Sequence, residues 1–209
     1  TAALLWICSG ESFDFKPSNY INGSSFTWTV SVPEGIKRAS NSTSVASSIR
    51  QHLQNSTNAP LDATYTISLT LGPCAGEPFE LKVTIQPAPS INFFEQDQTL
   101  CTGGNSKDVI FSSTVAGASF SWTADSKGVL GVTEFDTGNT LPVQQLTNPT
   151  NQPITIEYKV SVSTTTGGVC SDTPKIYQMT VNPTLSLSED LSDFNGYQIG
   201  CFGADDGSI

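Results

Sequence analysis

The chain has 209 residues and a formal net charge of −10, with nine Lys and Arg against nineteen Asp and Glu. It carries no basic stripe that could neutralise nucleic-acid phosphates, and no apolar run approaches the roughly 18 residues that a membrane helix needs. The composition therefore excludes nucleic acid as a partner and insertion into a membrane.

Alternating apolar and polar residues predict short β-strands along the whole chain. In chain order the clearest segments are 25–30, 64–71, 79–85, 120–123, 154–162 and 176–181. Successive side chains of a strand point to opposite faces, so a period of two is typical of half-buried strands. Ser, Thr, Asn, Gly and Pro separate these segments, as expected for turns. The pattern predicts an all-β fold.

The sequence repeats itself with an offset of about 93 residues. Six anchors recur at that offset, namely Leu53, Asn55, Thr57, Asn58, Pro60 and Tyr65 as Leu146, Asn148, Thr150, Asn151, Pro153 and Tyr158. Cys8 recurs as Cys101 and Trp28 as Trp122, while Cys74 and Pro87 match Cys170 and Pro183. Self-similarity at a fixed period indicates tandem copies of one structural unit.

We therefore expect two domains, at 1–88 and 89–183, followed by a truncated third module at 184–209. The chain begins without Met, and we expect it to be a fragment of a larger protein whose first strand is cut short. The segment 45–55 resembles a short helix, but its counterpart contains Pro142, so we predict both to be strand or loop.

Several short strands per ninety residues, with a central Trp between two Cys, favour an immunoglobulin-like β-sandwich for each unit. Trp28 and Trp122 are then expected in the cores, together with Tyr65 and Tyr158.

The cysteines carry no C-x-x-C or Cys/His spacing, so we do not expect a zinc site. We predict one disulfide within each repeat, Cys8–Cys74 and Cys101–Cys170. By closing a loop of the unfolded chain, each bond would stabilise the fold by about 4 kcal/mol on the chain-entropy estimate. Such bonds indicate an oxidising compartment. Cys201 stands where a third unit would begin, and we expect it to be left unpaired by truncation.

The two units resemble PKD-like domains of long surface proteins of Bacteroidota. The resemblance rests on the openings "CSG" and "CTGG", the strands "FTWT" and "FSWT", the motif L-x-N-x-T-N-x-P…Y, and the closing segments "VTIQP" and "MTVNP". The tail "GCFGADDGSI" resembles the opening of a SprB-type repeat, a module of gliding-motility adhesins. The resemblance implies a cell-surface protein exported by the type IX secretion system, with neighbouring repeats and a substratum or surface polysaccharide as partners.

Residues that could carry chemistry are few. His52 is the only histidine, and Gln145 stands at its place in the second repeat, so a Ser/His/Asp triad is not expected. Glu134 and Asp136 could face one side of a strand, but the first repeat has Lys37 and Arg38 there.

Calcium is the remaining cofactor to consider, because it binds loop carboxylates. The weak candidates are Asp125, Glu134 and Asp136, or Asp205 and Asp206 in the tail. A D-x-D-x-D-G loop is absent from the sequence, so we expect no cofactor.

Three functions remain open at this stage. The first is a non-catalytic stalk segment of a surface adhesin that mediates attachment and motility. The second is a carbohydrate- or protein-binding module, for which an exposed aromatic cluster would be needed, with 93–96 ("FFEQ") as the candidate. The third is an accessory domain of a secreted hydrolase.

Overall fold

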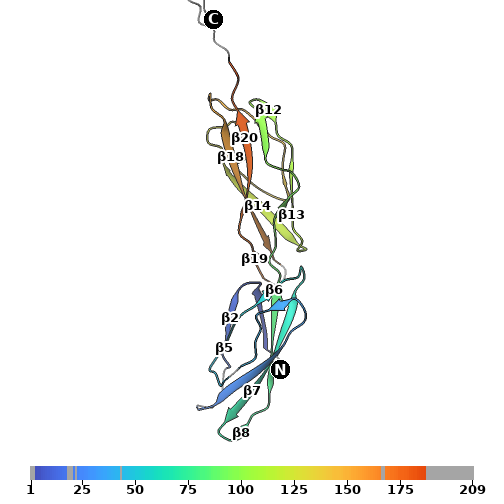
Figure 1. Cartoon of the computed structure of the whole chain (residues 1–209), viewed down its shortest axis with the longest axis vertical. Coiled ribbons are helices and arrows are strands. Elements are labelled where there is room, and N and C mark those ends of the chain that lie inside the picture. The colour runs from blue at the N-terminus through green and yellow to red at the C-terminus, as the bar shows by residue number, and fades with distance from the viewer. Residues whose placement is uncertain (1–2, 18–20, 22, 43, 166–167, 187–209) are drawn as a thin grey trace, which may run out of the picture.

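The computed structural model describes residues 3–17, 21, 23–42, 44–165 and 168–186. These residues form strands and turns, and two β-sandwich domains stand end to end along the long axis (Figure 1). Among them, no helix is long and apolar enough to cross a membrane. The all-β prediction is confirmed.

The main sheet of the first domain has the strand order β1-β9-β7-β3, with β8 beside β7. Its strands are β1 (Ala3–Cys8), β9 (Phe79–Gln86), β7 (Leu61–Leu71), β3 (Ser25–Ser31) and β8 (Cys74–Ala75). The first strand β1 runs parallel to the last strand β9, and Cys8 lies opposite Gln86. The other pairs are antiparallel. Cys8 therefore lies at the end of the domain where the chain leaves it.

The second layer of this domain consists of two short ribbons. They are β2 (Ser12–Phe15) with β5 (Ile49–His52), and β4 (Ile36–Lys37) with β6 (Gln54–Asn55). The segment 45–55 is therefore strand and loop, as predicted. Phe13 and Ile49 of this layer pack onto Tyr65 and Val83 of the main sheet, in one buried cluster.

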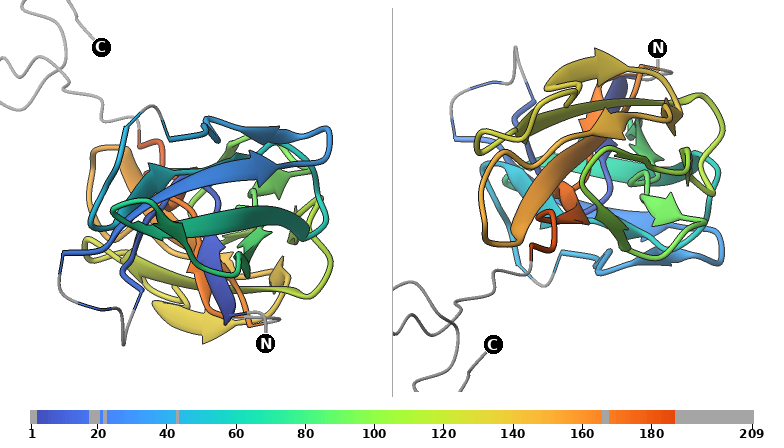
Figure 2. Two further views of the ribbon diagram at one scale, coloured as in Figure 1. Left: turned by 90° about the horizontal axis from the view of Figure 1, so that it is seen from below. Right: turned by 90° about the horizontal axis from the view of Figure 1, so that it is seen from above.

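The second domain repeats the plan with a main sheet ordered β11-β20-β18-β14-β15 and β19 beside β18. These strands are β11 (Gln98–Cys101), β20 (Lys175–Asn182), β18 (Ile154–Thr164), β14 (Ala118–Asp125), β15 (Phe135–Thr137) and β19 (Cys170–Ser171). The second layer contains β10 (Asn92–Phe93), β13 (Val109–Ser112), β16 (Thr140–Leu141), β12 (Gly104–Asn105) and β17 (Gln145–Leu146). Views along the long axis show the two layers of strands (Figure 2).

Each domain has its own hydrophobic core. Tyr65 belongs to the first cluster, and Trp122 and Tyr158 to the second; all three are almost fully buried. Trp28 differs from the prediction, because it is only partly buried against the first cluster. Its indole Nε1 donates to the carbonyl of Ser40 at 3.0 Å, at the edge of the sheet. That polar partner accounts for the position of Trp28 at the rim of its core.

Tyr65 and Tyr158 have equivalent hydrogen-bond partners that sequence reasoning missed. The hydroxyl of Tyr65 donates to Oε1 of Gln51 at 2.7 Å, and that of Tyr158 to Oε1 of Gln144 at 3.1 Å. Burial raises the pKa of both phenols, that of Tyr158 to about 12. The two glutamines are 93 residues apart, so the offset of the repeat was a signal that could have found them.

Candidate functional site

The two domains meet at a junction built from the ends of their strands. On the side of the first domain, Asn55 holds the loops together by hydrogen bonds. Nδ2 of Asn55 donates to the carbonyls of Ile85 and Ala59, at 2.9 and 2.7 Å. Its Oδ1 accepts from the backbone and hydroxyl of Thr57, at 2.9 and 2.7 Å. These bonds hold the loop before β7 against the end of β9. Asn148 repeats them in the second domain.

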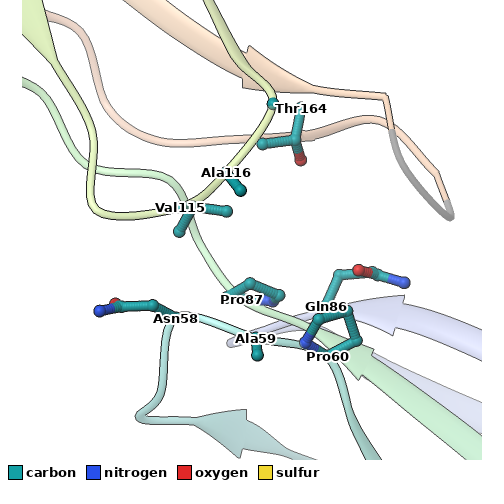
Figure 3. A pocket seen from close by; sticks show the side chains of 9 residues that line it. Asn58, Ala59, Pro60, Gln86, Pro87, Val115, Ala116 and Thr164 are labelled. Atoms are coloured by element: carbon teal, nitrogen blue, oxygen red, sulfur yellow. The ribbon is translucent and has the colours of Figure 1, made fainter.

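A mostly apolar cavity of about 300 Å³ lies between the facing ends of the domains (Figure 3). From the first domain it is lined by 58–60, Gln86 and Pro87, and from the second by 115–117 and Thr164. Thr164 is buried there, with 4% of its surface exposed.

The connector between the domains is held rather than free. Pro87 and Pro89 are buried, and proline fixes its own φ angle. The backbone N–H of Ser90 donates to Oγ of Ser113 at 3.1 Å, and Nζ of Lys175 donates to the carbonyl of Ile91 at 2.7 Å. The connector thus enters the second domain along a defined path.

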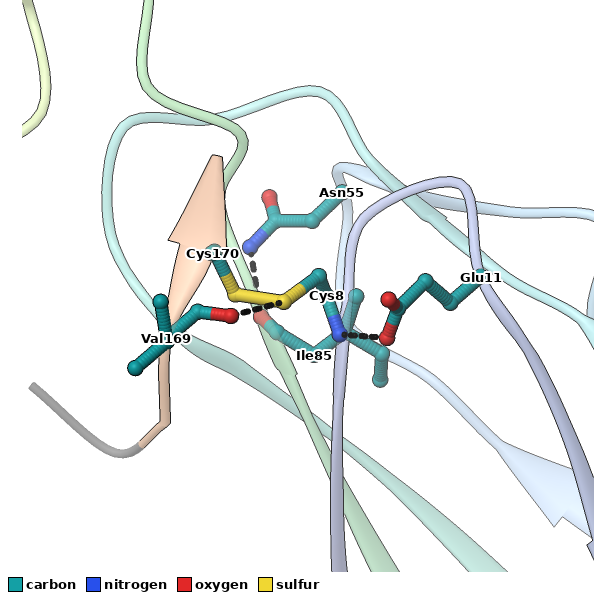
Figure 4. The surroundings of a disulfide bond; sticks show 6 residues. All are labelled: Cys8, Glu11, Asn55, Ile85, Val169 and Cys170. Carbon is teal, nitrogen blue, oxygen red and sulfur yellow. Dashed lines mark hydrogen bonds between the residues drawn. A yellow bond between two sulfur atoms is a disulfide. The ribbon is translucent and has the colours of Figure 1, made fainter. Parts of the chain in front are cut away.

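A disulfide joins the two domains directly. Cys8, at the end of β1, is bonded to Cys170 in β19 across a sequence separation of 162 residues, with the Cα atoms 5.6 Å apart (Figure 4). The backbone N–H of Cys8 donates to Oε2 of Glu11 at 3.0 Å. The Sγ of Cys8, which has no proton in the bridge, lies 3.5 Å from the carbonyl oxygen of Val169. Both cysteines are buried, with 8% and 0% of their surface exposed.

Trp6 adds a contact beside this bond. A β-carbon at Gly168 would overlap the indole ring of Trp6, so the glycine lets the ring lie against the loop before β19. Trp6 remains half exposed. The junction therefore combines the connector, one disulfide and one aromatic contact.

The predicted bonds Cys8–Cys74 and Cys101–Cys170 are wrong in this structure. Cys8 lies at the Gln86 end of β9, whereas Cys74 lies beyond its Phe79 end. The eight residues of β9 span about 24 Å between those ends. A disulfide requires Cα atoms roughly 4.4–6.8 Å apart, so the two cysteines of one domain cannot meet.

The same geometry holds in the second domain. Cys101 lies opposite Asn182 at one end of β20, while Cys170 pairs with Thr164 beyond the other end. Cys74 and Cys101 are both exposed free thiols. Cys201, Asp205 and Asp206 lie outside the residues that the structure describes.

Among the described residues, the acidic side chains considered for calcium, those of Asp125, Glu134 and Asp136, do not form a metal-binding cluster. Oδ1 of Asp125 accepts from the backbone of Lys127 at 3.0 Å, and Oδ1 of Asp136 from that of Thr137 at 2.8 Å, so both stabilise turns. In the described part of the chain, no group of three or more His, Cys, Asp or Glu side chains is placed to hold a metal ion, and Glu134 belongs to no such group.

His52 lies in β5, where its Nδ1 is 3.4 Å from Oγ of Ser12 at an exposed position. In the aromatic candidate 93–96, Phe93 packs inward against Phe111 and Tyr177, so that of its two aromatic rings only that of Phe94 is exposed. A single exposed aromatic ring is common on protein surfaces and does not form a binding platform.

Comparisons with known proteins agree with this architecture. The profile of the PKD-like domain matches residues 6–89 and 98–185. No significant match was found among curated proteins.

Solved structures resemble the chain at low identity. The IG1+IG2 domains of DIP-gamma align at 9% identity and a TM-score of 0.40, over 88% of this chain and 95% of that one. The EC1-3 fragment of mouse clustered PcdhgC3 aligns at 13% identity and a TM-score of 0.36, over 87% of this chain and 65% of that one. An endo-fucoidan hydrolase of glycoside hydrolase family 107 aligns at 11% identity and a TM-score of 0.32, over 88% of this chain and 28% of the hydrolase.

The family profile covers most of the chain in two successive copies, each with its own core. The chain therefore belongs to the PKD-like domain family.

Proposed function

We propose that the chain is a non-catalytic stalk segment of a large cell-surface adhesin of the SprB type, borne by a gliding bacterium. In this role it transmits load between the cell and the surface to which the cell attaches. The observation that carries the proposal is the Cys8–Cys170 bond, which joins two tandem domains at the junction where they meet.

The bond lies on the path that a stretching force would take. β1 leads directly to Cys8, and Cys170 is followed by β20, from which the chain leaves at the far end of the second domain (Figure 1). A force applied to the two ends therefore passes through the disulfide. Residues 9–169, which hold most of both cores, are bypassed by that path. This arrangement suits a segment that must not lengthen under load.

The junction also restricts bending. One connector alone would allow the domains to swivel about it, whereas two covalent links allow rotation only about the line that joins them. The buried prolines of the connector and the Trp6 contact oppose that remaining rotation. We infer a stiff segment with a fixed angle between its domains.

A location outside the cytoplasm fits the same bond, because disulfides form and persist in oxidising compartments. We propose display at the cell surface, with the boundaries 1–88 and 89–183 for the two domains and a further module from 184 onwards. Neighbouring domains of the same polypeptide are then the immediate partners.

The test uses the full-length surface protein in its native cell. Replacing Cys8 and Cys170 with Ser should reduce attachment under flow, while surface labelling with an antibody shows unchanged display. The paired control is Val45→Ser with Val143→Ser, two exposed positions, one in each domain, that touch neither the bond nor its surroundings. Attachment that is equal in the mutant and the native strain would contradict a load-bearing role.

A carbohydrate-binding role remains the alternative from the sequence, and a glycan array would distinguish the two. The stalk role predicts no specific glycan for this chain. Strong binding to one class of glycan would replace the stalk role by a recognition role.

A further inference from the structure

Among the residues that the structure describes, Cys74 and Cys101 are free, and they lie at opposite ends of the two-domain body, in the same settings as the two bonded cysteines. We propose that Cys101 and Cys74 are the two halves of further junction disulfides. Cys101 would bond to a following PKD-like unit at the position equivalent to Cys170, and Cys74 to a preceding unit at the position equivalent to Cys8. The proposal rests on the stalk role described above.

The surroundings of Cys101 match those of Cys8 in strand pairing and in the hydrogen bonds of the residue that follows, although the bond from Cys8 to Glu11 has no counterpart. Both cysteines end the first strand of their sheet, opposite the last residue of the final strand. The next residue then donates its backbone N–H to that same partner: Ser9 to Gln86 at 2.8 Å, and Thr102 to Asn182 at 2.9 Å.

The hydroxyls of those residues repeat the match. Oγ of Ser9 bonds both the N–H and the carbonyl of Asn55, at 3.0 and 3.2 Å. Oγ1 of Thr102 does the same to Asn148, at 2.9 and 3.3 Å. The end of the second domain therefore presents its thiol on the same scaffold that presents Cys8 to its partner.

Cys74 matches Cys170 in the same way. Each begins a two-residue strand that pairs with the last residue of the preceding long strand, Leu71 for Cys74 and Thr164 for Cys170. Each follows a glycine two residues earlier, Gly72 and Gly168, both with positive φ.

What differs between the matched positions is cover. Thr164 is 4% exposed and Leu71 is 38% exposed, while Cys170 is fully buried and Cys74 is exposed. A β-carbon at Gly168 would meet Trp6, whereas one at Gly72 would meet nothing within 4 Å. The end of the first domain that carries Cys74 is thus equivalent to the end of the second domain that carries Cys170. It differs in that no neighbouring domain covers it.

The chemistry balances through thiol–disulfide exchange. One thiolate attacks the disulfide of an oxidant, such as a disulfide-bearing oxidoreductase of the cell envelope, and forms a mixed disulfide. The second thiolate displaces the oxidant, which leaves with two electrons as a dithiol, while the two thiols give up two protons. A tether between neighbouring units raises the effective concentration of the two cysteines, as the connector does for Cys8 and Cys170.

A second copy of the same chain is the probe, because it carries both halves. In the Cys101→Ser/Cys201→Ser variant, Cys74 is converted to its mixed disulfide with 5-thio-2-nitrobenzoate. It is mixed with the Cys74→Ser/Cys201→Ser variant, whose Cys101 thiol is free. Attack of Cys101 on Cys74 releases the coloured thiolate and leaves a dimer, so absorbance and a non-reducing gel follow the same reaction.

The matched controls pair like with like, Cys74 with Cys74 and Cys101 with Cys101, at the same concentrations. The expected result is exchange between Cys74 and Cys101 that is about tenfold faster or more than either control, because only that pair docks the two faces that meet in the native junction. Equal or slower exchange, including none, would overturn the proposal. That failure would leave the Cys8–Cys170 bond and the attachment test of the stalk role untouched.

Discussion

The junction disulfide makes a quantitative prediction about stretching. The perturbation is removal of the bond, by a reductant or by Cys8→Ser with Cys170→Ser, in a Cys201→Ser background that leaves no thiol in the tail. The bond holds residues 162 positions apart at a Cα distance of 5.6 Å. An extended chain spans roughly 3.5 Å per residue, so breaking the bond should release about 560 Å of extra length.

The release should come in two steps, because each domain has its own core. The segment from Cys8 to Ile91 and that from Ile91 to Cys170 are similar in length, so each step should measure about 280 Å. Single-molecule force spectroscopy with handles at the two ends measures both values. With the bond intact, neither step should occur at the same forces.

The matched control is Cys74→Ser with Cys101→Ser, which should stretch like the native chain. If the bonds lay within the domains instead, they would span 66 and 69 residues, and reduction would release only about 470 Å. The control variant would then lose both bonds and lengthen. Either result would refute the junction bond.

Three further predictions concern the domains themselves. Asn148→Ala should destabilise the second domain by about 2–4 kcal/mol in urea denaturation, because it leaves buried partners such as the carbonyl of Val181 unbonded. Asn55→Ala should destabilise the first domain by the same amount, and a loss below about 1 kcal/mol in either variant would contradict this role. The raised pKa of Tyr158 stabilises the fold fully below pH 10, and this contribution should be lost as the pH rises from 10 to about 12, by up to about 3 kcal/mol. The Tyr158→Phe variant should lack that part of the loss in the free energy of unfolding at alkaline pH. If stability falls with pH as steeply in the variant as in the native chain, the prediction is contradicted. His52→Gln should change stability by less than about 0.5 kcal/mol, because Gln145 stands at the equivalent place and the side chain is at an exposed position; a larger loss would show a role that the structure does not reveal.

Much of the fold could be predicted from the sequence. The alternation in 64–71 and 154–162 located the two long central strands, β7 and β18, because a strand with one buried face imposes a period of two. The repeat placed Tyr65 and Tyr158 in equivalent cores. The glutamines that bond them were within reach of the same comparison.

The cysteine pairing could not be predicted in this way. A repeat shows which residues are equivalent, but it does not show at which end of the sandwich each one lies. That depends on β1 running parallel to β9, which places Cys8 at the exit of its domain. The two cysteines of one unit therefore lie at opposite ends of its sandwich, and Cys8 bonds instead to Cys170 of the other domain.

The junction contact was hidden for a different reason. Trp6 and Gly168 lie on different domains, and the equivalents of the pair are Thr99 and Gly72. Comparison of the repeats therefore gives no signal for the Trp6 contact. It depends on how two successive copies stack, which is not encoded in either copy alone.

The most direct measurement is a non-reducing tryptic map of the native chain. Cleavage after Lys and Arg, except before Pro17, places Cys8, Cys74, Cys101, Cys170 and Cys201 in five different peptides. Mass spectrometry should find peptide 1–37 linked to peptide 160–175 through Cys8 and Cys170. A link from 1–37 to 51–82, with another from 83–107 to 160–175, would contradict the junction bond.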